Sequence, residues 1–75
     1  IVHDGGCASS CEGFLVRARQ SRKVTTYGSN TAGIFDYGNV RDFRMPCGTL
    51  VLRHPTTKSG YLPEMAIDNV GLAPQ

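Results

Sequence analysis

Apolar side chains recur at helical spacing in one segment near the start of the chain. Between about Ser10 and Ser21, Phe14 and Leu15 lie three and four residues after Cys11, and Ala18 lies four and three residues after them. Most charged and amide side chains of the segment fall outside this stripe. The pattern predicts an amphipathic helix over 10–21 whose apolar stripe packs against the rest of the fold.

Shorter runs on either side of this helix have the composition of strands. A short strand is expected at about Ile1–His3, and the β-branched and aromatic run Val24–Tyr27 predicts a second one. Two further runs, at about Val40–Met45 and Thr49–Arg53, flank Pro46-Cys47-Gly48. They predict a hairpin with a short loop.

Glycines mark the connections. Gly5-Gly6 predicts a turn between the first strand and the helix, and Gly28–Gly33 is a loop of small and polar residues suited to the edge of a binding cleft. Gly13 lies inside the predicted helix, where it costs about 1 kcal/mol relative to alanine. It therefore suggests that another backbone approaches the helix closely. His54 precedes Pro55, which biases it to an extended conformation and predicts the end of a strand there.

Ser9 lies at the predicted start of the helix. The unpaired N–H groups and the positive dipole end of a helix stabilise negative charge, so an oxyanion formed beside Ser9 would be favoured. This position suits the nucleophile of an acyl-transfer reaction. Ser9-x-x-Glu12 is also a capping box, in which the serine only terminates the helix.

Three short sequence segments, in this order along the chain, support the interpretation of Ser9 as a nucleophile. They are Cys7-Ala8-Ser9-Ser10-Cys11-Glu12-Gly13-Phe14, then Gly28-Ser29-Asn30-Thr31-Ala32-Gly33, and finally Ile67-Asp68-Asn69-Val70-Gly71-Leu72-Ala73-Pro74. Together they resemble the S41 peptidases, which include the C-terminal (tail-specific) processing proteases, the tricorn core protease and the interphotoreceptor retinoid-binding protein modules. The resemblance implies an α/β fold of the ClpP/crotonase-like S41 type. Strand, helix and strand would be followed by a β-hairpin and a closing strand.

The resemblance also implies roles for individual residues. Ser9 takes the place of the nucleophile, the backbone N–H of Ser10 that of an oxyanion-hole donor, and Asp68 that of the acid behind a histidine base. Ser10 is the less favoured nucleophile. The substrate cleft would include Gly5, Gly6, Thr31, Ala32 and Gly33.

The base itself is not identified within the chain. Ile34 stands where the processing proteases have their lysine, and neither His3 nor His54 matches the family's histidine, which would precede Ile1. His3 is expected to be solvated or bonded to the backbone. A local triad of Ser9, His54 and Asp68 is geometrically possible. We therefore expect residues 1–75 to form the C-terminal portion of one catalytic domain, inactive without the remainder of that domain.

Composition bears on three further questions: the state of the cysteines, a zinc site and a nucleic-acid partner. The 75 residues carry a formal net charge of +2 and three cysteines, an odd number that leaves at least one without a partner in the chain. Cys7 and Cys11 form a disulfide or remain as buried thiols, and the spacing of the three cysteines does not suit a zinc site. The basic cluster of Arg17, Arg19, Arg22 and Lys23 has no interleaved aromatic residues, which disfavours a nucleic-acid partner.

Two functions follow as expectations. The first is an S41-like serine endopeptidase without metal or other cofactor, which acts on a peptide or protein substrate. The second is a non-catalytic relative whose cleft binds a peptide or an apolar ligand. The resemblance further implies export to the periplasm or cell envelope.

Overall fold

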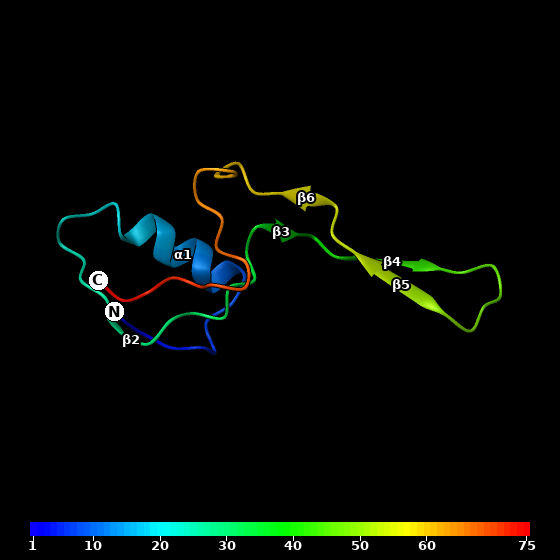
Figure 1. The fold of residues 1–75 in the computed structure, drawn as a ribbon, viewed down its shortest axis with the longest axis horizontal. Helices are drawn as coiled ribbons and strands as arrows, with labels where there is room; N and C mark the ends of the chain where they lie inside the picture. Colours follow the sequence, from blue (N-terminus) through cyan, green and yellow to red (C-terminus); the bar gives the residue numbers. More distant parts are fainter.

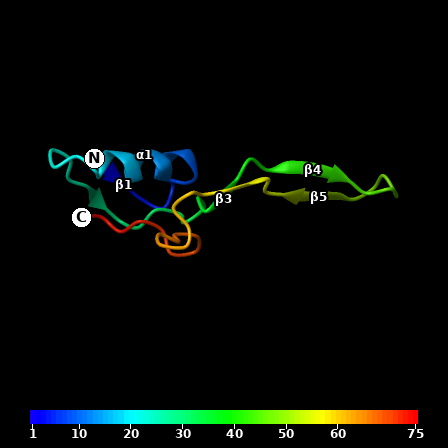
Figure 2. The ribbon, with the colours of Figure 1, turned by 90° about the horizontal axis from the view of Figure 1, so that it is seen from above.

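The computed structural model describes all residues from 1 to 75 as one helix and six short strands (Figure 1). The elements are β1 (Val2–His3), α1 (Ser10–Ala18), β2 (Tyr27–Gly28), β3 (Tyr37–Gly38), β4 (Arg41–Arg44), β5 (Val51–His54) and β6 (Thr57–Lys58). The molecule measures 53 × 23 × 16 Å. Its long axis arises because the β4–β5 hairpin projects away from the body that contains α1 and both termini (Figures 1 and 2).

Three two-stranded pairings organise the chain. β1 and β2 are parallel, with Val2 opposite Tyr27, and α1 lies in the connection between them. β3 pairs with β6 and β4 pairs with β5, both antiparallel. The result is a small mixed structure of helix and strands, and its parallel pair bridged by a helix is compatible with the expected α/β class.

A small apolar core lies between α1 and the C-terminal segment. It consists of Cys7, Leu15, Val16, Ile67 and Leu72, with Phe35 and Met65 packed against it. The buried side of α1 is only partly the predicted stripe. Leu15 is 1% exposed, but Phe14 is 59% exposed and Cys11 is also on the surface. The stripe was wrong at these two positions because the helix turns Glu12 and Val16 inward instead.

The element boundaries agree with the expectations only in part. The hairpin is confirmed and β5 ends at His54, as the following proline predicts. The helix ends at Ala18 rather than Ser21, and only Tyr27 of the run 24–27 is in a strand, because Ser21 and Val24 pair in a turn. β3 and β6 were not predicted, since each has only two residues.

The expected closing strand does not form, and no strand follows Lys58. The last residues are held by threonine hydroxyls instead of a continuous strand ladder. The N–H of Leu72 donates to Thr31 Oγ1 at 2.7 Å, and the N–H of Gln75 donates to Thr26 Oγ1 at 2.9 Å. Side-chain acceptors therefore replace the regular pairing that defines a strand.

Two glycines allow the C-terminal segment to come this close. Gly33 has φ +72°, and a Cβ there would lie 2.7 Å from both the Ile67 carbonyl and the Gly71 amide. Gly71 has φ +76° and would place a Cβ against the Thr31 carbonyl. Neither position accepts a side chain without moving backbone.

Both faces of the projecting hairpin mix apolar and charged residues. The Phe43–Leu52 pair shares its face with Arg41 and His54. On the other face Asp42 pairs with Arg53 at 2.9 Å, next to Arg44 and Val51. Every residue of β4 and β5 is exposed. The hairpin therefore adds little to the core.

In the whole chain there is no helix with the length and apolar character needed to cross a membrane.

We expect Leu15→Ala to lower the free energy of unfolding by about 2–4 kcal/mol, because it empties the centre of a small core. Phe14→Ala is the matched control on the same helix, and its exposed ring should cost less than about 1 kcal/mol. Denaturant titration followed by circular dichroism measures both. Equal losses for the two variants would contradict the observed orientation of α1.

Candidate functional site

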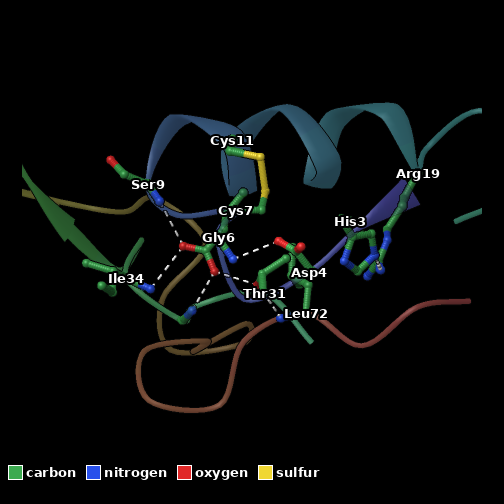
Figure 3. Close-up of a disulfide and its surroundings, with 12 residues drawn as sticks. His3, Asp4, Gly6, Cys7, Ser9, Cys11, Arg19, Thr31, Ile34 and Leu72 are labelled. Atoms are coloured by element: carbon green, nitrogen blue, oxygen red, sulfur yellow. Dashed lines mark hydrogen bonds between the residues drawn. A yellow bond between two sulfur atoms is a disulfide. The ribbon is translucent and has the colours of Figure 1, made fainter. Parts of the chain in front are cut away.

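Ser9 has an unusual backbone conformation. It is the N-cap of α1, with φ 55° and ψ −115°, a combination that is strained for any residue with a side chain. Strain of this kind costs about 1–3 kcal/mol and persists only where the surroundings impose it. Figure 3 shows the Ser9 hydroxyl pointing outward, away from the network of hydrogen bonds beneath it.

The Glu12 carboxylate helps to hold this conformation, together with the Ile34 carbonyl, which accepts the same Ser9 N–H at 3.0 Å. The carboxylate is completely buried, and its Oε2 accepts the N–H groups of Ser9 and Ile34, each at 2.9 Å. Its Oε1 accepts the Thr31 hydroxyl at 2.6 Å and the Gly33 N–H at 2.7 Å. One side chain thus ties the turn before α1 to the segment 31–34. The expected capping box of Ser9 and Glu12 is present, and the Glu12 carboxylate reaches well beyond the helix end.

These contacts determine the charge state of Glu12. Burial by itself raises the pKa of the carboxyl group, but the hydrogen bonds from Thr31, Ile34, Gly33 and Ser9 outweigh it and hold the pKa below the ordinary value of 4.5. Glu12 is therefore a buried anion with four donors. The dipoles of three backbone N–H groups and one hydroxyl stabilise its charge, and no cation does so.

A disulfide closes the same turn. Cys7 and Cys11 are bonded, which settles the choice that the sequence left open, and Cys47 is free and exposed at the hairpin tip. The bridge encloses Ala8, Ser9 and Ser10 within a five-residue loop (Figure 3). Cys11 is exposed rather than in the core, because it reaches back to Cys7 across the surface of the helix.

The backbone N–H of Ser10 has no acceptor in the protein. It is the first residue of α1, and the N–H of the next residue, Cys11, bonds to the Ala8 carbonyl at 3.1 Å. A free N–H at a helix N-terminus beside an outward-pointing hydroxyl is a suitable donor for an oxyanion.

Ser9 opens onto a groove between the start of α1 and the β3–β6 ribbon. The groove has a volume of about 350 Å³ and is lined by Ser9, Ser10, Phe35, Tyr37, Gly38, Asn39, Thr57, Lys58, Ser59, Gly60 and Tyr61. A second hollow of about 260 Å³ continues along α1 and is lined by Ser10, Gly13, Phe14, Arg17, Phe35 and Tyr61. The two share Ser10, Phe35 and Tyr61. We call them together the α1 groove.

Asp68, the expected acid, supports the loop that carries Phe35. Its Oδ1 accepts the N–H groups of Phe35 at 2.6 Å and of Asp36 at 2.8 Å. Asp36 reciprocates, since its buried carboxylate accepts the N–H groups of Ile67 and Asp68 at 2.9 Å each. The two aspartates therefore clamp the segments 35–36 and 67–68 together. Asp68 Oδ2 accepts no hydrogen bond and has no histidine beside it.

Neither histidine lines the α1 groove. The expectation that His3 is solvated or bonded to the backbone is wrong: it is buried, because β1 pairs with β2 beside α1, and its Nε2 lies 3.3 Å from Arg19 Nη2 at the opposite end of α1 from Ser9 (Figure 3). His54 is exposed where β5 ends, with Nδ1 3.3 Å from its neighbour's carbonyl. No group of three or more His, Cys, Asp or Glu side chains is arranged to hold a metal ion.

The residues expected in the substrate cleft lie elsewhere. None of Gly5, Gly6, Thr31, Ala32 and Gly33 lines the α1 groove. Thr31 and Gly33 are buried beneath Ser9 as partners of Glu12, and Gly6 donates its N–H to Asp4 Oδ1 at 2.8 Å. Their contribution is to shape the turn.

The sequence interpretation missed other residues of the groove. Nothing local in the sequence marks Thr57, Lys58, Ser59 and Gly60 as groove residues, because β6 comes near Ser9 through its pairing with β3. For the second hollow, the spacing of its residues along α1 was visible in the sequence. Ser10 lies three and four residues before Gly13 and Phe14, and Arg17 lies four and three residues after them, so all four share one face of α1.

Comparisons of the chain with family models, with curated proteins and with solved structures gave no match.

We expect Glu12→Gln to lower the free energy of unfolding at pH 7 by about 2–3 kcal/mol, because a neutral amide replaces a buried anion that accepts four hydrogen bonds. The pKa of Glu12 is lower in the folded protein than in the unfolded chain. Its charge therefore stabilises the fold above pH 4.5, and this contribution is lost as the pH falls from there through the folded pKa.

Denaturant titrations between pH 7 and pH 2 measure this effect. The difference between the original protein and Glu12→Gln should shrink as the pH falls below 4.5. Glu64→Gln is the control, since Glu64 is exposed and makes no hydrogen bond through its side chain. A pH-independent difference for Glu12→Gln would show that the charge of Glu12 is unimportant.

Proposed function

We propose that this protein forms the nucleophile-bearing part of a serine peptidase that resembles the S41 family. The observation that carries the proposal is the conformation of Ser9: a strained, non-glycine residue at a helix N-terminus, with its hydroxyl directed outward onto a groove. A simple helix cap needs no such strain. A nucleophile on a sharp strand-to-helix turn does, because strain exposes its oxygen.

The reaction would be acyl transfer from a peptide. Ser9 Oγ attacks the peptide carbonyl, and the negative charge that develops on the carbonyl oxygen is stabilised by the free N–H of Ser10 and the dipole of α1. The base takes the Ser9 hydroxyl proton and gives it to the nitrogen of the scissile bond, so that the amine departs to leave an acyl-enzyme, which water then hydrolyses. Glu12 positions the nucleophile by fixing the backbone of Ser9.

The base is proposed to come from outside residues 1–75. No histidine lines the α1 groove, and by the resemblance the exposed Ile34 stands at the position of the processing proteases' lysine. Asp68 retains Oδ2 for a further donor, which suits an acid that orients an imidazole supplied by the remainder of the same domain. The ClpP/crotonase-like fold of the whole domain is part of this proposal.

The absence of a base beside Ser9 favours one alternative. A relative without catalysis would use the α1 groove to bind a peptide, and the strained turn would present the Ser10 N–H to the ligand. The Cys7–Cys11 disulfide supports an exported protein under either function, since disulfides persist in oxidising compartments.

We expect the full-length gene product that contains these residues to react covalently with a fluorophosphonate probe at Ser9. Ser9→Ala should abolish labelling, because it removes the only proposed nucleophile and leaves the groove in place. In-gel fluorescence and peptide mass spectrometry measure the extent and the position of the label.

Ser10→Ala is the matched control. It keeps the backbone N–H and should retain most of the labelling. Circular dichroism of each variant establishes that it is folded. A folded protein that does not label would favour the binding alternative, and labelling that survives Ser9→Ala would assign the nucleophile to another serine.

A further inference from the structure

The charged side chains that line the α1 groove are all positive. Its lining contains two charged residues, Lys58 from β6 and Arg17 from α1, and no aspartate or glutamate. Two of the six acidic residues of the chain, Glu12 and Asp36, are buried beneath the surface with all their hydrogen bonds directed inward. The groove therefore presents positive charge to any ligand.

Neither cation is neutralised by the protein. The single ion pair of the structure joins Arg53 to Asp42 in the distant hairpin, and the side chains of Lys58 and Arg17 make no hydrogen bond. They lie in opposite halves of the groove, with Ser10 common to both halves. A ligand that crosses the Ser9 turn would pass both.

Aromatic side chains form the wall between these two positions. Phe35 and Tyr61 line both hollows, and their ring centroids are 6.3 Å apart. Phe35 packs against α1 where the helix has Gly13, and a Cβ there would lie only 3.0 Å from the ring. The helix is therefore adapted to keep Phe35 in the groove. Apolar contact at the centre and a cation in each half suit a chain with an apolar side chain between carboxylates.

We propose that the α1 groove selects acidic peptides, and that Lys58 and Arg17 are the specificity-determining residues that receive carboxylates on the two sides of the Ser9 turn. This inference rests on the proposed function in taking a peptide as the ligand. The carboxylates come from acidic side chains or, at one end, from a free C-terminus. Both sources share the chemistry that an exposed cation recognises.

The test measures binding and needs no catalysis. Ser9→Ala protein is titrated at low salt with an acetylated and amidated peptide, Glu-Ala-Tyr-Ala-Glu, and with its twin, Gln-Ala-Tyr-Ala-Gln. Amide chemical shifts in nuclear magnetic resonance spectra give the affinity and the location. We expect the glutamate peptide to bind more tightly, to shift Ser10, Phe35 and Tyr61, and to lose its advantage at about 0.5 M salt, where charges are screened within a few ångströms.

Substitutions assign the effect to the groove. Lys58→Gln and Arg17→Gln should each weaken binding of the glutamate peptide by about twofold to fivefold, the range for an exposed ion pair, and the double variant by about the product. Lys23→Gln and Arg22→Gln remove the same charges from exposed positions outside the groove and should have no such effect. The twin peptide with a free C-terminal carboxylate distinguishes the two sources of charge, since tight binding of that form would assign one cation to the C-terminus.

Equal affinity for the glutamate and glutamine peptides would overturn the proposal. Equal losses in the groove and control variants would do the same, because they would reflect net charge alone. Failure here is distinct from failure of the peptidase proposal. Acidic selectivity without labelling of Ser9 would contradict only the catalytic role, and labelling without acidic selectivity would contradict only this inference.

Discussion

The Glu12 carboxylate is the interaction on which the rest of this structure depends. It is a buried anion without a cation, and four donors from two separate segments of the chain surround it. Their dipoles are fixed by the fold, so the charge holds the turn before α1 against the segment 31–34. The strained conformation of Ser9 is a consequence of this packing. The Cys7–Cys11 disulfide and the Ile34 carbonyl hold the same turn beside the Glu12 charge.

Hydrogen bonds from side chains also hold the C-terminal segment in place. A core of five buried apolar residues is small for 75 residues, and side-chain acceptors supplement it where Ile67, Asp68, Leu72 and Gln75 dock. Thr31 links the two systems, because it donates to Glu12 and accepts the N–H of Leu72. Asp36 and Asp68 form the corresponding clamp on the other side. Stability and the geometry of the Ser9 turn are therefore properties of one network.

The α1 groove lies next to the loop 35–36, which the hydrogen bonds to Asp68 hold in place. Clamping the loop 35–36 places Phe35 against Gly13, and the chain then continues into the β3–β6 ribbon that faces the start of the helix. The sequence interpretation expected another backbone near Gly13, and the structure places an aromatic ring there instead. It also assigned the loop Gly28–Gly33 to the cleft. That loop lies underneath, where the Thr31 hydroxyl and the Gly33 N–H donate to Glu12.

The sequence by itself determined the local features: a helix that begins after Ser9, the glutamate three residues later, the hairpin and the end of β5 before Pro55. These follow from contacts between residues close together in the chain, for which spacing and residue type are sufficient. Only the tertiary structure decided which face of α1 is buried, that Cys7 and Cys11 are bonded, and that Lys58 reaches the groove beside Ser9. Those outcomes depend on segments brought together from distant parts of the chain, and their energies come from packing that no single segment contains.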